Sequence, residues 1–369
     1  MSQYCKSSLW LALKFIPRLS IQKKLQLVEK VGLKKLFSAD FDLSTLSLSD
    51  NQKLAIRHPN WEKINLIIEE SRTCHSTIVA YEDKAYPTLL KEIHDPPLVL
   101  FVRGDKNLLN NLQVAIVGSR HSTCTGNDIA LKLSSDLSES GIAVTSGLAL
   151  GIDAKAHIGA MSKSGKTIAV VATGLDSVYP RRHLKLFREI INNGGVVVSE
   201  FPPNTLPRAG HFPKRNRIIS GMSAGVVVVE AKIKSGSLLT AKSALEQNRE
   251  VFSVPGSIFN EQSQGCNYLI QQGAKLVTSS ADILEEFPKF ELQLKKQTTK
   301  LRTDLKESTK SDKQDLFLDP LLASVGYEIT PIDVVVSRSK LPTDVVITRL
   351  TVLELKGAIS AVPGGYLRL

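Results

Sequence analysis

The chain has 369 residues, of which 42% are hydrophobic, so it can bury a sizeable core and is long enough for two or three domains. Lys and Arg number 47 against 36 Asp and Glu, a formal net charge of +11, which favours a polyanionic partner because each neutralised phosphate releases condensed counterions. No apolar run approaches the ~20 residues of a transmembrane helix, so we expect no membrane insertion.

The cysteines and the first residues indicate the cellular compartment. Cys5, Cys74, Cys124 and Cys266 are scattered and lack metal-ligand spacing, which predicts reduced thiols and no metal site. Lys14 interrupts the first apolar stretch, and no small-residue cleavage site follows it. This stretch predicts an amphipathic helix rather than a signal peptide. We therefore expect a cytoplasmic protein.

The first 75 residues predict a helical domain, because apolar residues such as Leu9, Leu13 and Ile16 recur near helical spacing. From residue 76 to residue 288, short Val- and Ile-rich runs alternate with amphipathic segments of helix length. Such alternation is typical of a parallel sheet covered on both faces. This region predicts a doubly wound, mostly parallel, Rossmann-like α/β domain. Its strands are expected over 78–81, 98–102, 114–117, 142–144, 167–171, 196–198, 226–229 and 251–254.

The last part of the chain predicts a linker and a small module. Residues 289–315 are dense in Lys, Thr, Ser and acids, which predicts a flexible linker. Helix-turn-helix signals followed by a hairpin then indicate a winged-helix-like domain over 316–369. Its helices are expected over 316–325, 332–338 and 343–355, and its hairpin strands over 359–362 and 366–369.

A first candidate site follows the strand over 114–117. Gly118, Ser119 and Arg120 come directly after it, and Gly126 opens the next helix. Bare backbone amides and a helix N-terminus can bind a phosphate there, and Arg120 can add a bidentate contact. A tight turn with a solvated Arg explains this segment equally well. The spacing is not the dinucleotide fingerprint and no ribose-binding acid follows, so we expect no nicotinamide or other cofactor.

A second segment, 146–157, follows the next strand. Gly147 and Gly151 keep the loop bare, and Asp153 and His157 lie one helical turn apart. The pair could serve acid–base chemistry. Capping and packing are the commoner roles of such residues, and we favour them here.

A third segment, over 207–217, interleaves cations with an aromatic residue, the pattern expected for single-stranded nucleic acid: cations follow phosphates while a ring stacks on a base. We interpret it as a binding loop rather than as a generic solvated loop. Its candidate residues are Arg208, Phe212, Lys214, Arg215 and Arg217.

A fourth segment follows the strand over 226–229. Ser235, Gly236 and Ser237 offer amides and hydroxyls at the start of a helix that also carries Lys242. The Walker A spacing is missing, so ATP hydrolysis is not indicated. Because the carboxyl ends of parallel strands share one sheet edge, we expect all four segments to converge on one basic pocket.

The order of these motifs resembles the DNA-processing protein A family (DprA, also called Smf) across roughly residues 80–285. The resemblance is carried by GSR, SGLALGIDAKAH, TGLDSVYPRRH, HFPKRNRIISGMS and SGSLLTAKSALEQNREVFSVPG. It implies an extended Rossmann fold and homodimers that bind and protect incoming single-stranded DNA and load the recombinase RecA during natural transformation, without enzymatic activity. A single-strand-binding protein is a further candidate partner.

The resemblance also implies which residues bind DNA. The family's pocket is built around the position of Arg120, with cations from the third segment and stacking by Phe212. The pair Arg181 and Arg182 falls where the family often has another basic residue. The family's N-terminal module is of the SAM or helix-hairpin-helix-like type. Its Ile-Pro-Gly-Ile-Gly clamp reads IPRLS over 16–20 here, which argues against DNA binding by this module.

Two other functions compete with single-strand binding. A related Rossmann family of nucleotide phosphoribohydrolases carries P-G-G-x-G-T-x-x-E; here Thr240 is retained, but the residues that follow it, Lys242 among them, supply no Glu at that spacing. A transcription regulator would use the winged-helix-like domain. Its third expected helix carries only Arg349 as a cation before Lys356, so we expect this domain to serve protein contacts or dimer regulation instead.

Overall fold

The computed structural model describes residues 5–163, 165–287, 321–326, 328–339, 341–355 and 357–368. The chain divides into two compact units, Met1–Leu294 and Lys295–Leu369. The linker expected over 289–315 lies outside the described residues, as does the first part of the helix expected over 316–325. None of the helices in the described ranges is both long enough and apolar enough to cross a bilayer.

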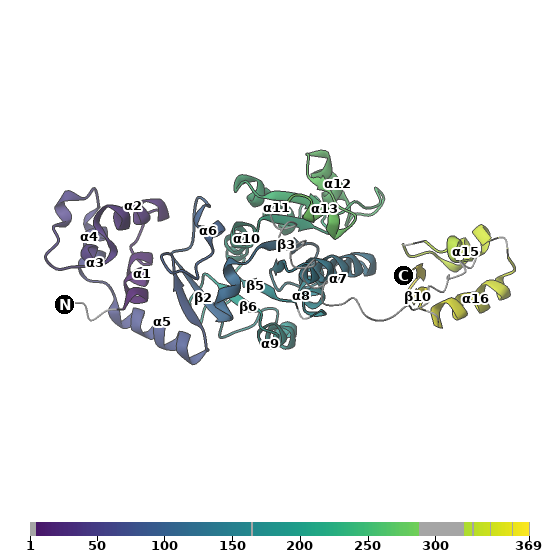
Figure 1. The fold of residues 1–369 in the computed structure, drawn as a ribbon, viewed down its shortest axis with the longest axis horizontal. Helices are drawn as coiled ribbons and strands as arrows, with labels where there is room; N and C mark the ends of the chain where they lie inside the picture. The colour runs from purple at the N-terminus through teal and green to yellow at the C-terminus, as the bar shows by residue number, and fades with distance from the viewer. Residues whose placement is uncertain are drawn as a thin grey trace, which may run out of the picture. The chain divides into compact units, whose positions relative to one another are not determined.

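The larger unit is built on a nine-stranded sheet with the order β1-β2-β6-β5-β4-β3-β7-β8-β9 (Figure 1). Neighbouring strands from β6 to β9 are parallel, whereas β2 is antiparallel to both β1 and β6. The eight expected strands are confirmed, and β9, with two residues, is an addition. The bounds are β1 Thr77–Ala80, β2 Val99–Gly104, β3 Gln113–Val117, β4 Ala143–Ser146, β5 Thr167–Val171, β6 Val196–Ser199, β7 Gly225–Val228, β8 Glu250–Ser253 and β9 Lys275–Leu276.

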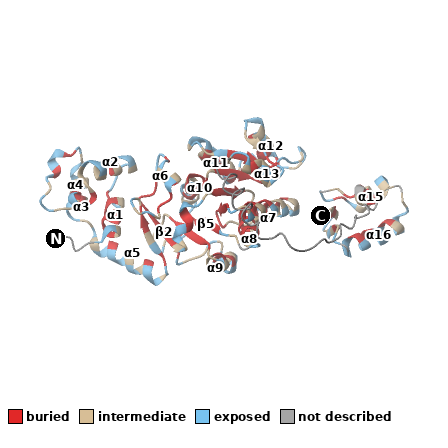
Figure 2. Ribbon diagram, viewed as in Figure 1, coloured by how far each residue is buried: buried red, intermediate tan, exposed pale blue. Residues whose placement is uncertain are grey.

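Helices cover both faces of this sheet because its strands are apolar on both sides. In β3, Val114 and Ile116 pack in a cluster with α7 and α8, whereas Ala115 and Val117 pack in a second cluster with α10 and α11. Figure 2 shows the buried residues concentrated in the strands and on the inner sides of the helices. The helices are α6 Thr88–Lys91, α7 Cys124–Glu139, α8 Ile152–Met161, α9 Leu184–Asn192, α10 His211–Met222, α11 Gly236–Glu246, α12 Gln264–Gln271 and α13 Ser280–Leu284.

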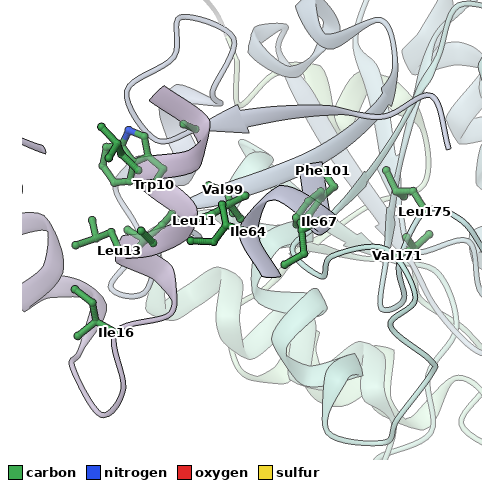
Figure 3. Close-up of a cluster of buried hydrophobic side chains, with 14 of the residues drawn as sticks. Trp10, Leu11, Leu13, Ile16, Ile64, Ile67, Val99, Phe101, Val171 and Leu175 are labelled. Carbon is green, nitrogen blue, oxygen red and sulfur yellow. The ribbon is translucent and has the colours of Figure 1, made fainter. Parts of the chain in front are cut away.

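The N-terminal helices pack directly against this sheet. Trp10 of α1 and Ile67 of α5 are buried in one hydrophobic cluster with Val99 and Phe101 of β2 (Figure 3). The Nζ of Lys14 also donates to the carbonyl oxygen of Glu200, at 2.6 Å. These contacts therefore cross the boundary expected at residue 75. The bounds are α1 Lys6–Lys14, α2 Ile21–Val31, α3 Leu33–Leu36, α4 Asp50–Arg57 and α5 Trp61–Thr73.

The smaller unit has the winged-helix order of elements. A 3-10 turn, η4 (Leu322–Ser324), precedes α15 (Ile332–Ser339), α16 (Thr343–Leu355) and the antiparallel hairpin of β10 (Ile359–Val362) and β11 (Gly365–Arg368). Its core brings together apolar side chains from both helices and from the hairpin. The expected second and third helices and the hairpin are confirmed.

Candidate functional site

The sheet has a topological switch point at β3. The chain runs from β3 through β4 and β5 to β6 on one side and then returns to β7 on the other side of β3. Ligands of open α/β sheets bind at the carboxyl ends of the strands at such a point. A cavity of about 410 Å³ lies here, lined by Gly118, Ser119 and Arg120 after β3 and by Ser235–Ser237 after β7.

The loops around this cavity approach one another too closely for side chains at two glycines. A Cβ on Gly118 would lie 2.6 Å from Cγ1 of Ile152 and 3.0 Å from the carbonyl oxygen of Glu230. Gly151 adopts φ +72° against the carbonyl of Ser119, which accepts from the amide of Ile152 at 3.2 Å. The glycines therefore set the shape of the cavity floor.

The N-terminus of α7 is occupied by the protein itself. The Glu230 carboxylate accepts from the amide of Thr123 at 2.9 Å and from its hydroxyl at 2.6 Å. The Thr123 hydroxyl in turn caps the amide of Gly126 at 3.0 Å. The expectation that a phosphate binds at the start of this helix is therefore wrong, because a buried carboxylate already fills that position.

The N-terminus of α11, in contrast, faces the cavity. Ser235 caps the helix by accepting from the amide of Leu238 at 3.4 Å, and its hydroxyl lies 2.9 Å from that of Ser237. A Cβ on Gly236 would meet nothing within 4 Å, so the backbone there is open. Unpaired amides and the helix dipole make such an end favourable for an anion. Ser235, Gly236 and Ser237 all line the cavity.

The cationic segment over 207–217 is not a single loop, because α10 begins at His211. Phe212, Arg215, Asn216 and Ile219 line the cavity at helical spacing. Arg217 faces other partners: its Nη2 bonds both carboxylate oxygens of Glu200, at 2.8 and 2.7 Å, and its Nε lies 3.6 Å from Asp95. Arg217 therefore holds the helix in place and does not line the cavity.

Arg215 forms a buried charge pair below the cavity. Its side chain is 6% exposed and its Nη1 lies 3.9 Å from the Asp153 carboxylate, which is 7% exposed. Burial raises the pKa of Asp153 and lowers that of Arg215, and each charge partly offsets the shift of the other. The Asp153 carboxylate also accepts from the amides of Gly147 and Ala149, at 3.1 and 3.4 Å. The pair thus fixes the loop after β4 against α10.

Aromatic rings lie beside the cationic rim. The Arg120 guanidinium lies over the Phe212 ring, with its Cζ 5.2 Å from the ring centroid. Tyr179 is 46% exposed, and its ring centroid is 5.9 Å from that of Phe212. These three side chains share a smaller hollow that opens next to the main cavity. A cation beside two accessible rings is the arrangement that a nucleobase and its phosphate would use.

The remaining expected residues lie outside the cavity lining in the described part of the chain. Lys242 is exposed on α11 with its Nζ 3.8 Å from Glu246. Arg181 and Arg182 are exposed in the 3-10 turn η3 (Arg181–His183). Arg208 is exposed just before α10, and Lys214 is exposed on α10.

Sequence reasoning missed five residues near the cavity. Lys232 and Lys234 extend from the end of β7 toward Ser235, and they could have been found by applying the carboxyl-edge rule to this whole loop. The other three are Tyr179, Asn216 and Gln262. No local sequence signal marks them, because the packing of distant segments brings them to the cavity.

Asp153 and His157 have the structural roles that the sequence favoured. The Nε2 of His157 accepts from the amide of Leu148 at 3.3 Å, and its Nδ1 lies 2.7 Å from the hydroxyl of Thr167. Burial, followed by the charges of His183 and Arg215, lowers the pKa of His157 to about 3. A neutral, fully buried imidazole is suited to holding the loop rather than to proton transfer at neutral pH.

Gly147→Ala is expected to destabilise the larger unit by about 1–3 kcal/mol, since overpacking costs about that much. The new Cβ would overlap the Arg215 guanidinium and lie 2.7 Å from the Asp153 carboxylate. Urea unfolding followed by circular dichroism measures the change. Gly236→Ala is the matched control, because open space surrounds that position. Equal stability of the two variants would contradict the close packing at Gly147.

The fold and the site define a Rossmann-type α/β protein with a cavity lined by cationic side chains at its switch point, joined to a winged-helix unit. The family model described as DNA recombination-mediator protein A matches residues 77–288, and the DprA winged helix domain matches residues 307–365. The chain belongs to this DNA processing protein A (DprA/Smf) family.

Relatives from several bacteria support this assignment. The chain is 45% identical to the protein Smf of Escherichia coli over 79% of this chain and 77% of that protein. The X-ray structure of DprA from Streptococcus pneumoniae superposes with a TM-score of 0.67 and 38% identity, covering 76% of this chain and 98% of that one. DprA from Helicobacter pylori, described for its single-stranded DNA binding mode, gives a TM-score of 0.53 and 31% identity, covering 58% and 98%.

Proposed function

We propose that this chain binds single-stranded DNA at the switch-point cavity without catalysing a reaction on it. The observation that carries the proposal is the position of exposed Arg120 over the Phe212 ring, beside exposed Tyr179 and next to the open N-terminus of α11. Cations and helix amides can bind successive phosphates, while the rings stack on bases of any sequence. The single-strand binding described for the Helicobacter pylori relative supports the same activity here.

The wider role that we propose is that of a recombination mediator. A homodimer would protect incoming single strands in the cytoplasm and load RecA on them during natural transformation. Membership of the recombination-mediator family supports this role. The winged-helix unit would serve protein contacts: its α16 carries Asp344 and Glu354 with Arg349, a poor charge pattern for reading a duplex.

Arg120→Ala is expected to weaken binding to a labelled oligothymidylate of about 30 nucleotides and to reduce the slope of log K against log salt by about 0.7, the contribution of one phosphate contact on a single strand. Fluorescence anisotropy at several salt concentrations measures both quantities.

Lys166→Ala is the control for this titration. Lys166 directly precedes β5, so it lies at the N-terminal ends of the parallel strands, whereas the cavity lies at their carboxyl ends. A duplex of equal length should bind more weakly than the single strand. Identical curves for wild type and Arg120→Ala would overturn the assignment of DNA to this cavity.

A further inference from the structure

The loop after β4 carries a residue in an unfavourable backbone conformation next to the site. Leu148 has φ +55°, and its side chain is fully buried in one hydrophobic cluster with Leu186 and Phe187 of α9. A left-handed backbone is uncommon for a bulky residue, and it persists only where the surrounding contacts fix it. The hydrogen bonds around Leu148 therefore identify the groups that hold this loop.

The peptide group between Leu148 and Ala149 is held from two sides. Its N–H, that of Ala149, donates to the Asp153 carboxylate of α8 at 3.4 Å. Its carbonyl oxygen, that of Leu148, lies 2.9 Å from Nδ1 of His183, which is 35 residues away in the sequence. A carbonyl oxygen only accepts, so Nδ1 of His183 carries a proton and donates it to this bond. The orientation of the peptide group thus depends on a distant segment as well as on α8.

This hydrogen bond joins two segments that line the smaller hollow. One segment is the loop after β4, which contributes Ala149 and Leu150. The other leads into η3 and contributes Tyr179 and Pro180. His183 ends η3, its side chain is partly buried, and its amide donates to the carbonyl of Pro180 at 2.9 Å. His183 is therefore fixed to one segment through its backbone and holds the other through its side chain.

We propose that His183 is a positioning residue for single-strand binding, through its hydrogen bond to the Leu148 carbonyl. Without this bond the peptide group can rotate, because its oxygen is no longer fixed. Ala149 moves with it, and Ala149 lines both the hollow and the main cavity. DNA must then order the loop as it binds, which lowers the affinity. The inference rests on the proposed function, because it assumes that a base enters the hollow, and it adds a residue that itself touches no DNA.

His183→Ala is expected to bind the labelled oligothymidylate about tenfold more weakly than the wild type, which corresponds to the loss of one base stack. The slope of log K against log salt should keep its wild-type value, because a residue that contacts no phosphate releases no counterions. Fluorescence anisotropy with the full-length protein at several salt concentrations measures both quantities. A reduced slope would show that His183 binds a phosphate directly and would overturn the positioning role.

Two amide variants test the hydrogen bond itself. In His183→Asn the side-chain nitrogen can take the place of Nδ1 and donate to Leu148, so the affinity should return to near the wild-type value. In His183→Gln the donor lies one bond further out, so the affinity should stay low. Equal affinities of these two variants would overturn the inference, even if His183→Ala fails to fold. His58→Ala is the matched control, because His58 is an exposed histidine that follows α4.

A double-mutant cycle with Tyr179→Ala tests whether His183 acts through the hollow. Tyr179→Ala removes a ring that lines the hollow and should itself weaken binding. Because the ring and the positioned loop would bind the same base, His183→Ala should cause a smaller further loss in this variant than in the wild type. Full additivity of the two effects would mean that His183 acts elsewhere and would overturn the inference.

The outcomes separate this inference from the proposed function. If the wild type binds the oligothymidylate and His183→Ala binds it equally well, the positioning role is overturned and single-strand binding stands. If the wild type binds no single strand, the proposed function falls, and the positioning role falls with it.

Discussion

Trp10→Ala is expected to destabilise the larger unit by about 3–5 kcal/mol, the usual cost of truncating a buried aromatic side chain to alanine. Trp10 is fully buried, and its ring lies 5.9 Å from that of Tyr81, just after β1. The surrounding cluster joins α1 and α5 to β2 (Figure 3). Truncation would therefore leave a cavity between the N-terminal helices and the sheet. Urea unfolding followed by circular dichroism measures the loss.

Trp61→Ala is the matched control, because Trp61 is only partly buried and should cost less. The form of the transition also tests whether residues 1–75 are a separate domain. A single cooperative transition that shifts as a whole would show that these helices fold with the sheet. An early transition confined to part of the signal, with the main one unchanged, would contradict the shared core and would support a boundary near residue 75.

Acidification from pH 7 to pH 4 is expected to cost about 3 kcal/mol through His157 alone. Burial and neighbouring positive charge lower the folded pKa of His157 to about 3, against about 6.5 in an unfolded chain. Between these values the unfolded chain binds a proton that the folded protein does not. The contribution is fully present above the unfolded pKa and is lost progressively as the pH falls toward the folded pKa.

His157→Gln isolates this effect from other titrating groups. A glutamine can still bond the amide of Leu148 and the hydroxyl of Thr167, but it does not titrate. Urea midpoints at pH 7 and pH 4 for both proteins give the comparison. The variant should lose less stability on acidification than the wild type by about 3 kcal/mol. Equal losses would mean that His157 accepts a proton in the folded state.

Much of the fold follows from local pattern. The eight apolar strand runs have the length and composition of buried strands, and their positions are confirmed to within a few residues. The hairpin and the second and third expected helices of the smaller unit are confirmed as well. The order of strands in the sheet, and with it the switch point between β3 and β7, depends on long-range packing that no single segment records.

The site was harder to predict because a helix points cationic side chains that are close in sequence in different directions. Arg215 and Arg217 are two residues apart on α10, so one lines the cavity while the other turns toward Glu200. When this segment is interpreted as a loop, Arg215 and Arg217 are predicted to have the same role. The acidic partner of Arg217 is Glu200, and the carboxylate at the start of α7 is that of Glu230. Both come from segments distant in sequence, so the residues around Gly-Ser-Arg do not indicate them.

Photo-crosslinking tests the central claim most directly. A single-stranded oligonucleotide that carries 4-thiothymidine throughout would be irradiated with the full-length protein, and the crosslinked peptides would be identified by mass spectrometry. The account predicts crosslinks to peptides that contain Phe212 and Tyr179. Unlabelled single-stranded DNA should abolish these crosslinks by competition, and duplex DNA should compete less well. Crosslinks confined to the winged-helix unit or to α1–α5, with none beside Arg120, would contradict it.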